Sequence, residues 1–211
     1  MITVVGSYKG GTGKSTISFN LAVWLTTQGF DVETVDLDPQ ATLTDVAEVR
    51  AEEGIQPPLP VSNEFSDRTG SPDLQTVVDV GTADMKAMRH ALSLADQVFI
   101  PVPPSQADVW STQRFLGLVK ESRGGNEMPT LFSFVNRADT NPAVRETFET
   151  QEALKMIPGL KLVMARLGNR TTFRRSFSEG MAVFEFEPRG KAAAEMNALA
   201  TVIFSPLYIA G

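Results

Sequence analysis

The sequence predicts an α/β fold in which a doubly wound, mostly parallel sheet is flanked by helices. A short apolar segment, residues 1–5, comes directly before a glycine-rich loop, and a helical pattern over residues 15–28 follows that loop. The rest of the chain alternates short β-rich segments with longer helical ones. Such alternation is typical of parallel sheets, because a crossover helix must return the chain to the same edge before each new strand begins.

The composition indicates a single globular domain over residues 1–211. The chain has no cysteine, which excludes disulfides, thiolate zinc sites and iron–sulfur ligation. No apolar run approaches the ~18 residues of a membrane span, and Lys9 and Lys14 interrupt any leader-like segment. We therefore expect a soluble, cytoplasmic protein. The net charge of −6 disfavours a protein coated in nucleic acid and leaves room for a local basic patch.

The first predicted unit is a strand, a loop, a helix and a second strand. Ile17, Leu21 and Leu25 recur at helical spacing, and Gly29 stands where a left-handed C-terminal cap is expected. Residues Asp31–Asp36 alternate in polarity and predict the second strand. The crossover between these two parallel strands should be right-handed.

The remaining elements follow in the same alternating order. Strands are expected at residues 74–80, 97–102, 130–136 and 160–165, and helices at 42–53, 85–95, 107–123, 142–156, 171–179 and 190–204. Residues 54–72 contain four prolines and predict a loop. Ligands of such sheets bind at the carboxyl ends of the strands, so the functional residues should gather there.

The glycine-rich loop spans residues 6–16 and reads Gly-Ser-Tyr-Lys-Gly-Gly-Thr-Gly-Lys-Ser-Thr. Between a strand and a helix, such a loop directs backbone N–H groups inward, and the helix N-terminus adds partial positive charge, so the loop suits a phosphate. Lys14 is expected on the β- and γ-phosphates and the Ser15 hydroxyl on Mg²⁺. A merely glycine-rich turn is the alternative.

The spacing of the loop departs by one residue from the ordinary phosphate-binding pattern, because Tyr8 stands where the first glycine should be. The sequence Lys-Gly-Gly-x-Gly-Lys-Ser-Thr instead resembles the deviant Walker A motif of the ParA/MinD family of ATPases, P-loop NTPases of the SIMIBI class. Lys9 is the signature lysine of that motif. The resemblance implies that Lys9 reaches across a dimer interface to the partner's nucleotide, so that two ATP molecules are sandwiched in a homodimer.

The resemblance assigns further roles to this loop. Lys9, Lys14 and Asp38 are expected to be catalytic, and the nucleotide-binding residues are Gly10, Gly11, Thr12, Gly13, Lys14, Ser15, Thr16 and Asn136. ATP and Mg²⁺ are the expected ligands.

Three acidic residues follow two of the strands. The segment Asp36-Leu37-Asp38-Pro39-Gln40 resembles switch I of ParA-type proteins, which implies that Asp38 positions the attacking water. An ordinary carboxylate pKa of about 4 is too low for a strong general base at neutral pH. Asp79 closes an apolar strand in the Walker B pattern, and we expect Asp36 and Asp79, with Ser15, around Mg²⁺. Because Asp-Pro also begins turns, a solvated turn is the alternative for Asp38.

Two other segments extend the resemblance. Asn136 ends a strand where the family commonly places an asparagine against adenine, whose edge an amide can match with a donor and an acceptor. Asparagine after a strand is otherwise a common turn former. Residues 101–110 are similar to the family's Pro-Ser segment, which comes before a helix on the dimer face.

The stretch 153–178 carries six basic residues and no acidic one. Arginines beside small polar residues suit contact with phosphates without base reading. Since many ParA-type proteins bind DNA non-specifically in a similar region, we expect DNA contacts from Arg166, Arg170, Arg174 and Arg175. Of these, Arg170 and Arg174 are the strongest candidates. A solvated basic face with an intramolecular pair is the alternative.

The resemblance covers nearly the whole chain and implies a partition or positioning ATPase with weak intrinsic activity. Such a protein binds DNA non-specifically, associates with the nucleoid, and meets a ParB-like or other cargo adaptor that stimulates hydrolysis. The cargo could be a plasmid, a chromosome region or a protein assembly. Because the chain begins at its first strand, it resembles the small ParA type, which has no N-terminal helix-turn-helix.

Three alternatives share the expected fold. A dethiobiotin-synthetase-like ligase needs carboxylate-binding groups that the sequence does not reveal. A MinD-like membrane positioner holds membranes through a basic amphipathic tail, whereas residues 199–211 are apolar, contain Pro206 and have no lysine or arginine, so no membrane attachment is expected. A bacterial tyrosine kinase needs a tyrosine cluster, and the chain has two tyrosines.

Overall fold

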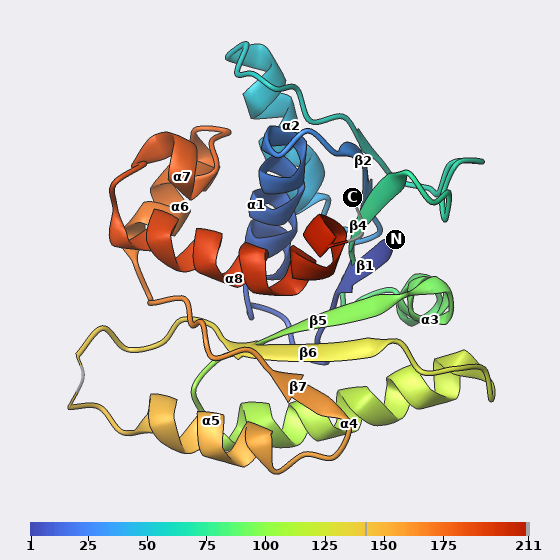
Figure 1. Ribbon diagram of the computed structural model, residues 1–211, viewed down its shortest axis with the longest axis vertical. Helices are drawn as coiled ribbons and strands as arrows, with labels where there is room; N and C mark the ends of the chain where they lie inside the picture. Colours follow the sequence, from blue (N-terminus) through green and yellow to red (C-terminus); the bar gives the residue numbers. More distant parts are fainter. Residues whose placement is uncertain (142, 210–211) are drawn as a thin grey trace.

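The computed structural model describes the backbone of residues 1–141 and 143–209, and the side chains of the same residues as far as Ser205. Its centre is one seven-stranded sheet in the order β3-β2-β4-β1-β5-β6-β7, and every pair of neighbours is parallel (Figure 1). The strands are β1 (Ile2–Val5), β2 (Asp31–Asp36), β3 (Val61–Ser62), β4 (Leu74–Asp79), β5 (Gln97–Val102), β6 (Thr130–Val135) and β7 (Leu160–Leu162). The predicted doubly wound α/β fold is confirmed.

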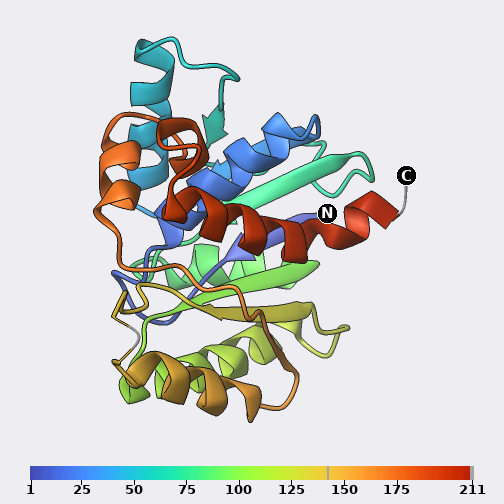
Figure 2. The same ribbon diagram turned by 60° about the vertical axis from the view of Figure 1, so that its left-hand side comes forward.

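Helices cover both faces of this sheet. They are α1 (Lys14–Thr27), α2 (Thr42–Glu52), α3 (Met85–Leu94), α4 (Gln106–Arg123), α5 (Glu146–Lys155), α6 (Thr171–Ser178), α7 (Val183–Phe186) and α8 (Lys191–Ile209). One core packs α1, α2 and the C-terminal helices against the sheet, and a second packs α3, α4 and α5 on the opposite face (Figures 1 and 2).

Alternation along the strands divides the side chains between the two cores. Val4 belongs to the core under α3 and α4, whereas its neighbour Val5 faces α1 and α8. Val78 and Val77 of β4 divide in the same way. Successive side chains on a strand point to opposite faces, so a strand covered on both sides is buried throughout, as β1 and β4 are.

The structure differs from the predicted elements by more than one residue at five places. The C-terminal helix, expected to end at residue 204, continues to Ile209. The helix expected from residue 142 begins at Glu146, and residue 142 itself lies outside the described residues. The last strand ends at Leu162 instead of residue 165. β3 and α7 were not predicted, because two or four residues are too few to show a period. β3 lies within the proline-rich segment and adds an edge strand to β2.

Parallel register brings the predicted acidic residues together. Asp79 is opposite Asp36 on one side and opposite Val5 on the other, so the ends of β2, β4 and β1 are level. The glycine-rich loop follows Val5 directly. All the strand-end residues that the sequence singled out therefore lie along one edge of the sheet.

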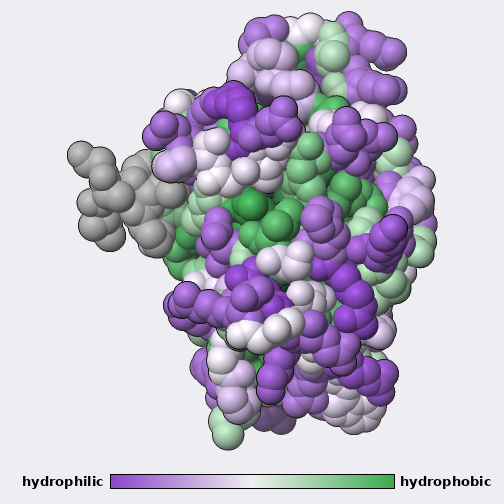
Figure 3. Space-filling model, turned by 90° about the vertical axis from the view of Figure 1, so that its right-hand side faces the viewer, coloured by the Kyte–Doolittle hydropathy of each residue, from purple (hydrophilic) through white to green (hydrophobic). Residues whose placement is uncertain are grey.

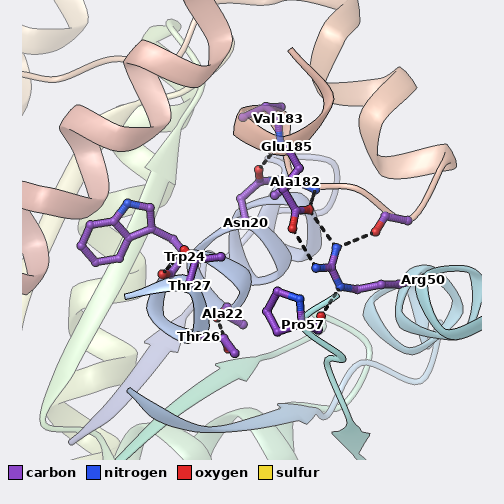
Figure 4. Close-up of polar contacts among 11 residues, drawn as sticks. Asn20, Ala22, Trp24, Thr26, Thr27, Arg50, Pro57, Ala182, Val183 and Glu185 are labelled. Carbon is purple, nitrogen blue, oxygen red and sulfur yellow. Dashed lines mark hydrogen bonds and ion pairs between the residues drawn. The ribbon is translucent and has the colours of Figure 1, made fainter. Parts of the chain in front are cut away.

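The turn between α6 and α7 docks onto α1 and α2 through buried polar contacts (Figure 4). The wholly buried Arg50 of α2 donates through Nε to the Pro57 carbonyl at 2.8 Å and through Nη1 to the Gly180 carbonyl at 3.0 Å. Asn20 of α1 accepts a hydrogen bond from the Val183 amide at 2.9 Å, and its own amide donates to the Thr16 carbonyl at 2.8 Å. The C-terminal helices are thereby tied to the two helices that begin at the strand-end edge.

The surface is mixed in character. Seen from the right-hand side of Figure 1, a hydrophobic area occupies the middle of the face and hydrophilic residues surround it (Figure 3). Among the helices of the described residues, none has both the length and the apolar character needed to cross a bilayer.

Candidate functional site

The glycine-rich loop is shaped by its glycines and by hydrogen bonds of its own. Gly11 and Gly13 have φ values of +74° and +94°, in the left-handed region that disfavours any residue with a Cβ. The Ser7 hydroxyl donates to the Lys9 carbonyl at 2.9 Å and lies 2.9 Å from the Thr12 hydroxyl. The loop is therefore held in shape by contacts within the protein.

Lys14, the first residue of α1, lies inside this loop with 7% of its surface exposed. Its Nζ donates to the Lys9 carbonyl at 3.3 Å. Burial lowers the pKa of Lys14, and the nearby charges of Asp79 and Asp38 act in the opposite direction. A cation that is already partly desolvated and aimed into the loop is well suited to bind a phosphate.

Asp79 is fully buried at the end of β4. Its Oδ1 accepts a hydrogen bond from the Ser18 hydroxyl at 3.0 Å, whereas its Oδ2 has no partner. Burial, helped by the nearby charge of Asp36, raises the pKa of Asp79 to about 6, against the opposing effects of the neighbouring Ser15 and Ser18 hydroxyls and of the Lys14 charge. A buried carboxylate oxygen without a partner is costly, and a Mg²⁺ ion would compensate it. Asp79 and Ser15 therefore fit the predicted metal site.

Asp36 is arranged differently from Asp79. Its Oδ1 accepts from the Asp38 amide at 3.0 Å, and its Oδ2 accepts from both the amide and the hydroxyl of Thr44, each at 3.0 Å. Oδ1 of Asp36 thus holds the turn that follows β2, and Oδ2 holds the first turn of α2. The sequence predicted this carboxylate only as a neighbour of Mg²⁺, because the contact with Thr44 depends on how α2 folds back.

Asp38 is half-buried at the entrance of the site. Its Oδ1 accepts from the Gln40 amide at 3.0 Å. The carboxylate also lies directly against Gly81, where an added Cβ would come within 2.3 Å of Oδ1. Gly81 follows β4 by two residues, so the position of Asp38 depends on the absence of a side chain there.

Two adjoining hollows form a cleft along this edge. The first hollow has about 210 Å³ and is called the phosphate compartment after the role predicted for its loop; it is lined by Gly10, Gly11, Gly13, Lys14, Ser15, Thr16, Asp38, Gln40, Thr42, Thr82, Ala83 and Arg137. The second has about 200 Å³ and is called the nucleoside compartment after the role predicted for Asn136; it is lined by Gly13, Thr16, Ile17, Asn136, Arg137, Gly168, Asn169, Arg170, Phe173 and Arg174. Gly13, Thr16 and Arg137 belong to both, so one elongated ligand with an anionic end could occupy the two together.

Asn136 lines the nucleoside compartment and also supports the loop; its contact with adenine stays a prediction. Its amide donates to the Thr12 carbonyl at 2.7 Å, and an added Cβ on Gly13 would come within 2.6 Å of the same amide nitrogen. Thr12 is buried and does not line either compartment. Asn136 thus joins the end of β6 to the loop after β1.

Lys9 is bound within its own chain. Its Nζ lies 3.0 Å from Oδ1 of Asp108, in the first turn of α4, while 43% of the Lys9 side chain and 15% of the Asp108 side chain are exposed. Ser105 caps this helix by accepting the Asp108 amide. The sequence predicted that Lys9 reaches a partner molecule; in the single chain it instead contacts the segment that resembles the family's Pro-Ser motif.

The four arginines predicted to contact DNA have different surroundings. Arg170 donates to both carboxylate oxygens of Glu195, with Nη2 at 2.6 Å from Oε1, so its charge is largely compensated. Arg174 is exposed and lines the nucleoside compartment, and Arg175 is exposed beside the Phe186 ring. Arg166 is exposed. Arg170 was one of the two strongest candidates for DNA contact, and its ion pair with Glu195 weakens that prediction.

Several residues of the cleft were not predicted. Gly81 could have been suspected, since a glycine near the end of a strand can mark a close approach of another group. Thr44, Asn20 and Asp108 were not predicted, because each acts through a contact that the folded backbone creates. Arg137 was hidden in the segment after β6, where its position depends on the backbone conformation.

Comparison with known proteins gives a consistent result. The sequence matches the CobQ/CobB/MinD/ParA nucleotide-binding domain over residues 3–183. It is 28% identical over 201 residues to maintenance of carboxysome distribution protein A of Halothiobacillus neapolitanus, covering 90% of each chain. It is also 28% identical over 222 residues to protein ParA of Rhizobium radiobacter, covering 98% of this chain and 97% of that one.

Solved structures share the fold. A putative plasmid partition protein of Borrelia burgdorferi bound to AMPPNP superposes with a TM-score of 0.73 at 19% identity, covering 97% of this chain and 98% of that one. The septum site-determining protein MinD of Pyrococcus horikoshii, complexed with Mg-ADP, gives a TM-score of 0.70 at 20% identity, covering 100% of this chain and 98% of that one.

Proposed function

Because the chain belongs to the CobQ/CobB/MinD/ParA family of nucleotide-binding domains, we propose that it is a ParA-type ATPase that segregates or distributes a cargo. The observation that carries this proposal is the glycine-rich loop with two lysines, Lys14 turned into the loop and Lys9 beside it at the surface. Names of relatives with low identity point the same way, since one concerns carboxysome distribution and another plasmid partition.

In the proposed reaction, ATP binds along the cleft and is hydrolysed to ADP and phosphate. Backbone N–H groups of the loop and Lys14 bind the phosphates, and Asp38 orients the water that attacks the γ-phosphate. Since Asp38 accepts the Gln40 amide and rests on Gly81, it is held in place before the substrate arrives. When bound by Ser15 and Asp79, Mg²⁺ would neutralise charge on the β- and γ-phosphates.

Dimerisation would be driven by ATP and by Lys9. In the single chain Lys9 pairs with Asp108, and the pair is partly exposed, so exchanging Asp108 for a partner's phosphate costs little. Tyr8 precedes Lys9 and Trp110 lies one helical turn into α4, and the two residues are 46% and 54% exposed. Exposed aromatic residues beside an exchangeable lysine suit a protein–protein interface.

The dimer would bind DNA non-specifically through exposed arginines. Arg166, Arg174 and Arg175 are available for phosphates, and Arg170 would contribute chiefly by holding α6 against Glu195 of α8. Phosphate contacts of this kind carry no base information and weaken steeply with salt. DNA binding would place the dimer at the nucleoid, and a ParB-like or other cargo adaptor would then stimulate hydrolysis and release it.

The test compares wild type with Lys9→Ala and Lys14→Ala. We expect Lys14→Ala to lose nucleotide binding, and Lys9→Ala to bind nucleotide but remain a monomer in ATP and Mg²⁺ by light scattering. A Lys9→Ala protein that still dimerises with ATP would contradict the proposed role of Lys9.

DNA binding is tested separately with Arg166→Glu combined with Arg175→Glu. ATP-dependent retention of DNA should fall, while ATP turnover without DNA should be unchanged. Undiminished retention would remove these arginines from the DNA surface. A ligase-type enzyme would instead hydrolyse ATP only in the presence of a small carboxylic acid. Neither its wild type nor its double variant would retain DNA.

A further inference from the structure

Arg137 has an unusual backbone conformation. Within residues 1–141 and 143–209, only two residues other than glycine have positive φ, Ala41 at 52° and Arg137 at 57°. A left-handed conformation is unfavourable for a long side chain, because the Cβ crowds the backbone. Such strain persists only where the surrounding structure imposes it, and it gathers at binding and catalytic sites.

The neighbours of Arg137 impose the conformation. On one side, the Asn136 amide nitrogen of the backbone donates to the Val102 carbonyl at 3.0 Å, and the Asn136 side chain is held by the loop. On the other side, the buried Ala138 donates to the Leu167 carbonyl at 2.9 Å and forms a bridge with Gly168. With both flanking residues fixed inward, the chain at Arg137 must turn outward.

The turn places Arg137 at the centre of the cleft. It lines the phosphate compartment together with Lys14 and Asp38, and it lines the nucleoside compartment together with Asn136 and Phe173. It is exposed, and within the described part of the chain its side chain makes no hydrogen bond or ion pair. Arg170, by contrast, lines only the nucleoside compartment and is engaged by Glu195.

We propose that Arg137 binds the α- and β-phosphates of the nucleotide from within the same chain. The inference rests on the proposed nucleotide binding and adds a residue to it. The guanidinium is a planar fork of donors that matches phosphate oxygens, and it needs no proton exchange to remain a cation. Because Arg137 lies where the two compartments join, it contacts the part of the polyphosphate that ADP and ATP share.

This position sets the expected pattern of effects. Loss of Arg137 weakens ADP and ATP equally, since both carry the α- and β-phosphates. It leaves adenosine unaffected, because adenosine has no phosphate.

Arg137→Gly separates the side chain from the backbone. Glycine adopts positive φ without strain, so this variant should unfold at the same temperature as wild type or a higher one. Its dissociation constant for MANT-ADP in Mg²⁺ should nevertheless rise about tenfold, the effect of losing one charge-assisted contact. Arg137→Asn provides a second variant, because asparagine tolerates the left-handed region.

Arg189→Ala is the matched control, since it removes an exposed arginine that lines none of the cleft. It should bind MANT-ADP as wild type does. Lys14→Ala distinguishes a failure of the Arg137 contact from a failure of nucleotide binding at this cleft. If Lys14→Ala loses MANT-ADP while Arg137→Gly binds normally, the role of Arg137 is wrong and nucleotide binding stands. If Lys14→Ala also binds normally, nucleotide binding at this cleft is wrong.

Competition by adenosine completes the test. Adenosine should displace MANT-ADP from Arg137→Gly with the same inhibition constant as from wild type. An inhibition constant that rises as much as the MANT-ADP dissociation constant would place Arg137 at the nucleoside and overturn the phosphate contact.

Discussion

Arg50 and Glu185 form a buried ion pair between residues 135 positions apart in the sequence. Both Nη atoms of Arg50 donate to the Glu185 carboxylate, each at 2.8 Å, and the carboxylate also accepts the Ala182 amide at 2.8 Å. The pair joins α2 to α7. Thr44 of α2 donates to Asp36, and Asn20 of α1 accepts from Val183, the first residue of α7. The geometry behind the nucleotide cleft therefore depends on a residue of α7 (Figure 4).

Arg50→Met should strongly reduce the free energy of unfolding. The substitution leaves the Glu185 charge and two carbonyls without their donor, and breaking a buried pair costs about 3–5 kcal/mol. Urea denaturation followed by circular dichroism measures the loss. Arg123→Met is the control, because among the residues that the structure describes Arg123 bonds to the carbonyls of Ser93, Ala95 and Glu127 and to no carboxylate, so its loss should cost less. An equal loss in both variants would show that the ion pair adds nothing.

Gly81→Ala should slow hydrolysis and preserve nucleotide affinity. The added methyl group would collide with the Asp38 carboxylate at 2.3 Å, so Asp38 must move away from the water it orients. We expect turnover to fall at least about tenfold, in proportion to the misplacement of a positioned group. Phosphate release and MANT-ADP titration measure the two quantities.

Gly117→Ala serves as the control for this substitution. Gly117 lies within α4, and nothing approaches an added Cβ within 4 Å. Alanine is favoured over glycine in a helix by about 1 kcal/mol, so the control should be slightly more stable and fully active. Normal turnover in Gly81→Ala would mean that Asp38 does not need its present position.

Asp79→Asn should stabilise the protein in the absence of ligand. The Asp79 carboxylate is fully buried with one oxygen unpaired, and a neutral amide at this position is less costly to bury. At pH 8 without Mg²⁺ the variant should melt at a higher temperature than wild type. With Mg-ADP the order should reverse, because only wild type gains from the cation. Thermal melts in the two conditions check this. If Asp79→Asn still melts at the higher temperature with Mg-ADP, Asp79 does not contribute to Mg²⁺ binding.

Glu33 should contribute a pH-dependent part of the stability. Burial acts to raise its pKa, but hydrogen bonds from Ser66, Thr69 and Thr76 outweigh burial and lower the pKa below its ordinary value of 4.5. A carboxyl whose pKa is lower in the folded state stabilises the protein above pH 4.5, and this contribution is lost as the pH falls through the folded pKa.

Glu33→Gln should therefore melt below wild type at pH 7, and the difference should shrink as the pH falls below the ordinary carboxyl value. Melting curves at a series of pH values measure this difference. A constant difference at all pH values would indicate a packing effect without linkage to protonation.

Local patterns were sufficient to predict the fold. The alternation of apolar strands with helices predicted the parallel sheet, and the glycine spacing of residues 6–16 predicted the phosphate loop. These features depend on residues close together in the chain, so their patterns are visible in the sequence. The register that places Asp36 opposite Asp79 joins two distant strands and was not predicted.

Contacts between distant segments were not predictable. The stretch 153–178 has no acidic residue in sequence, yet Glu195 of α8 compensates Arg170, and Glu152 of α5 pairs with Lys155. The sequence around Lys9 resembles the motif whose lysine acts on a partner molecule, but in the single chain Lys9 forms an ion pair with Asp108. The charge around an arginine depends on which acidic residues the fold brings close to it. A count of charges within one stretch of sequence therefore overestimates the number of arginines that are free to bind a ligand.

The contacts of α7 and α8 also define the smallest unit that can fold. The family match ends at residue 183, two residues before the counterion of Arg50 and before the Phe204 ring that stacks on Trp24 of α1. A shortened protein that stopped there would keep every phosphate-binding residue, and would also keep a buried guanidinium with no carboxylate to meet it. Deletion from the C-terminus should therefore abolish nucleotide binding by unfolding the protein, well before it reaches the cleft.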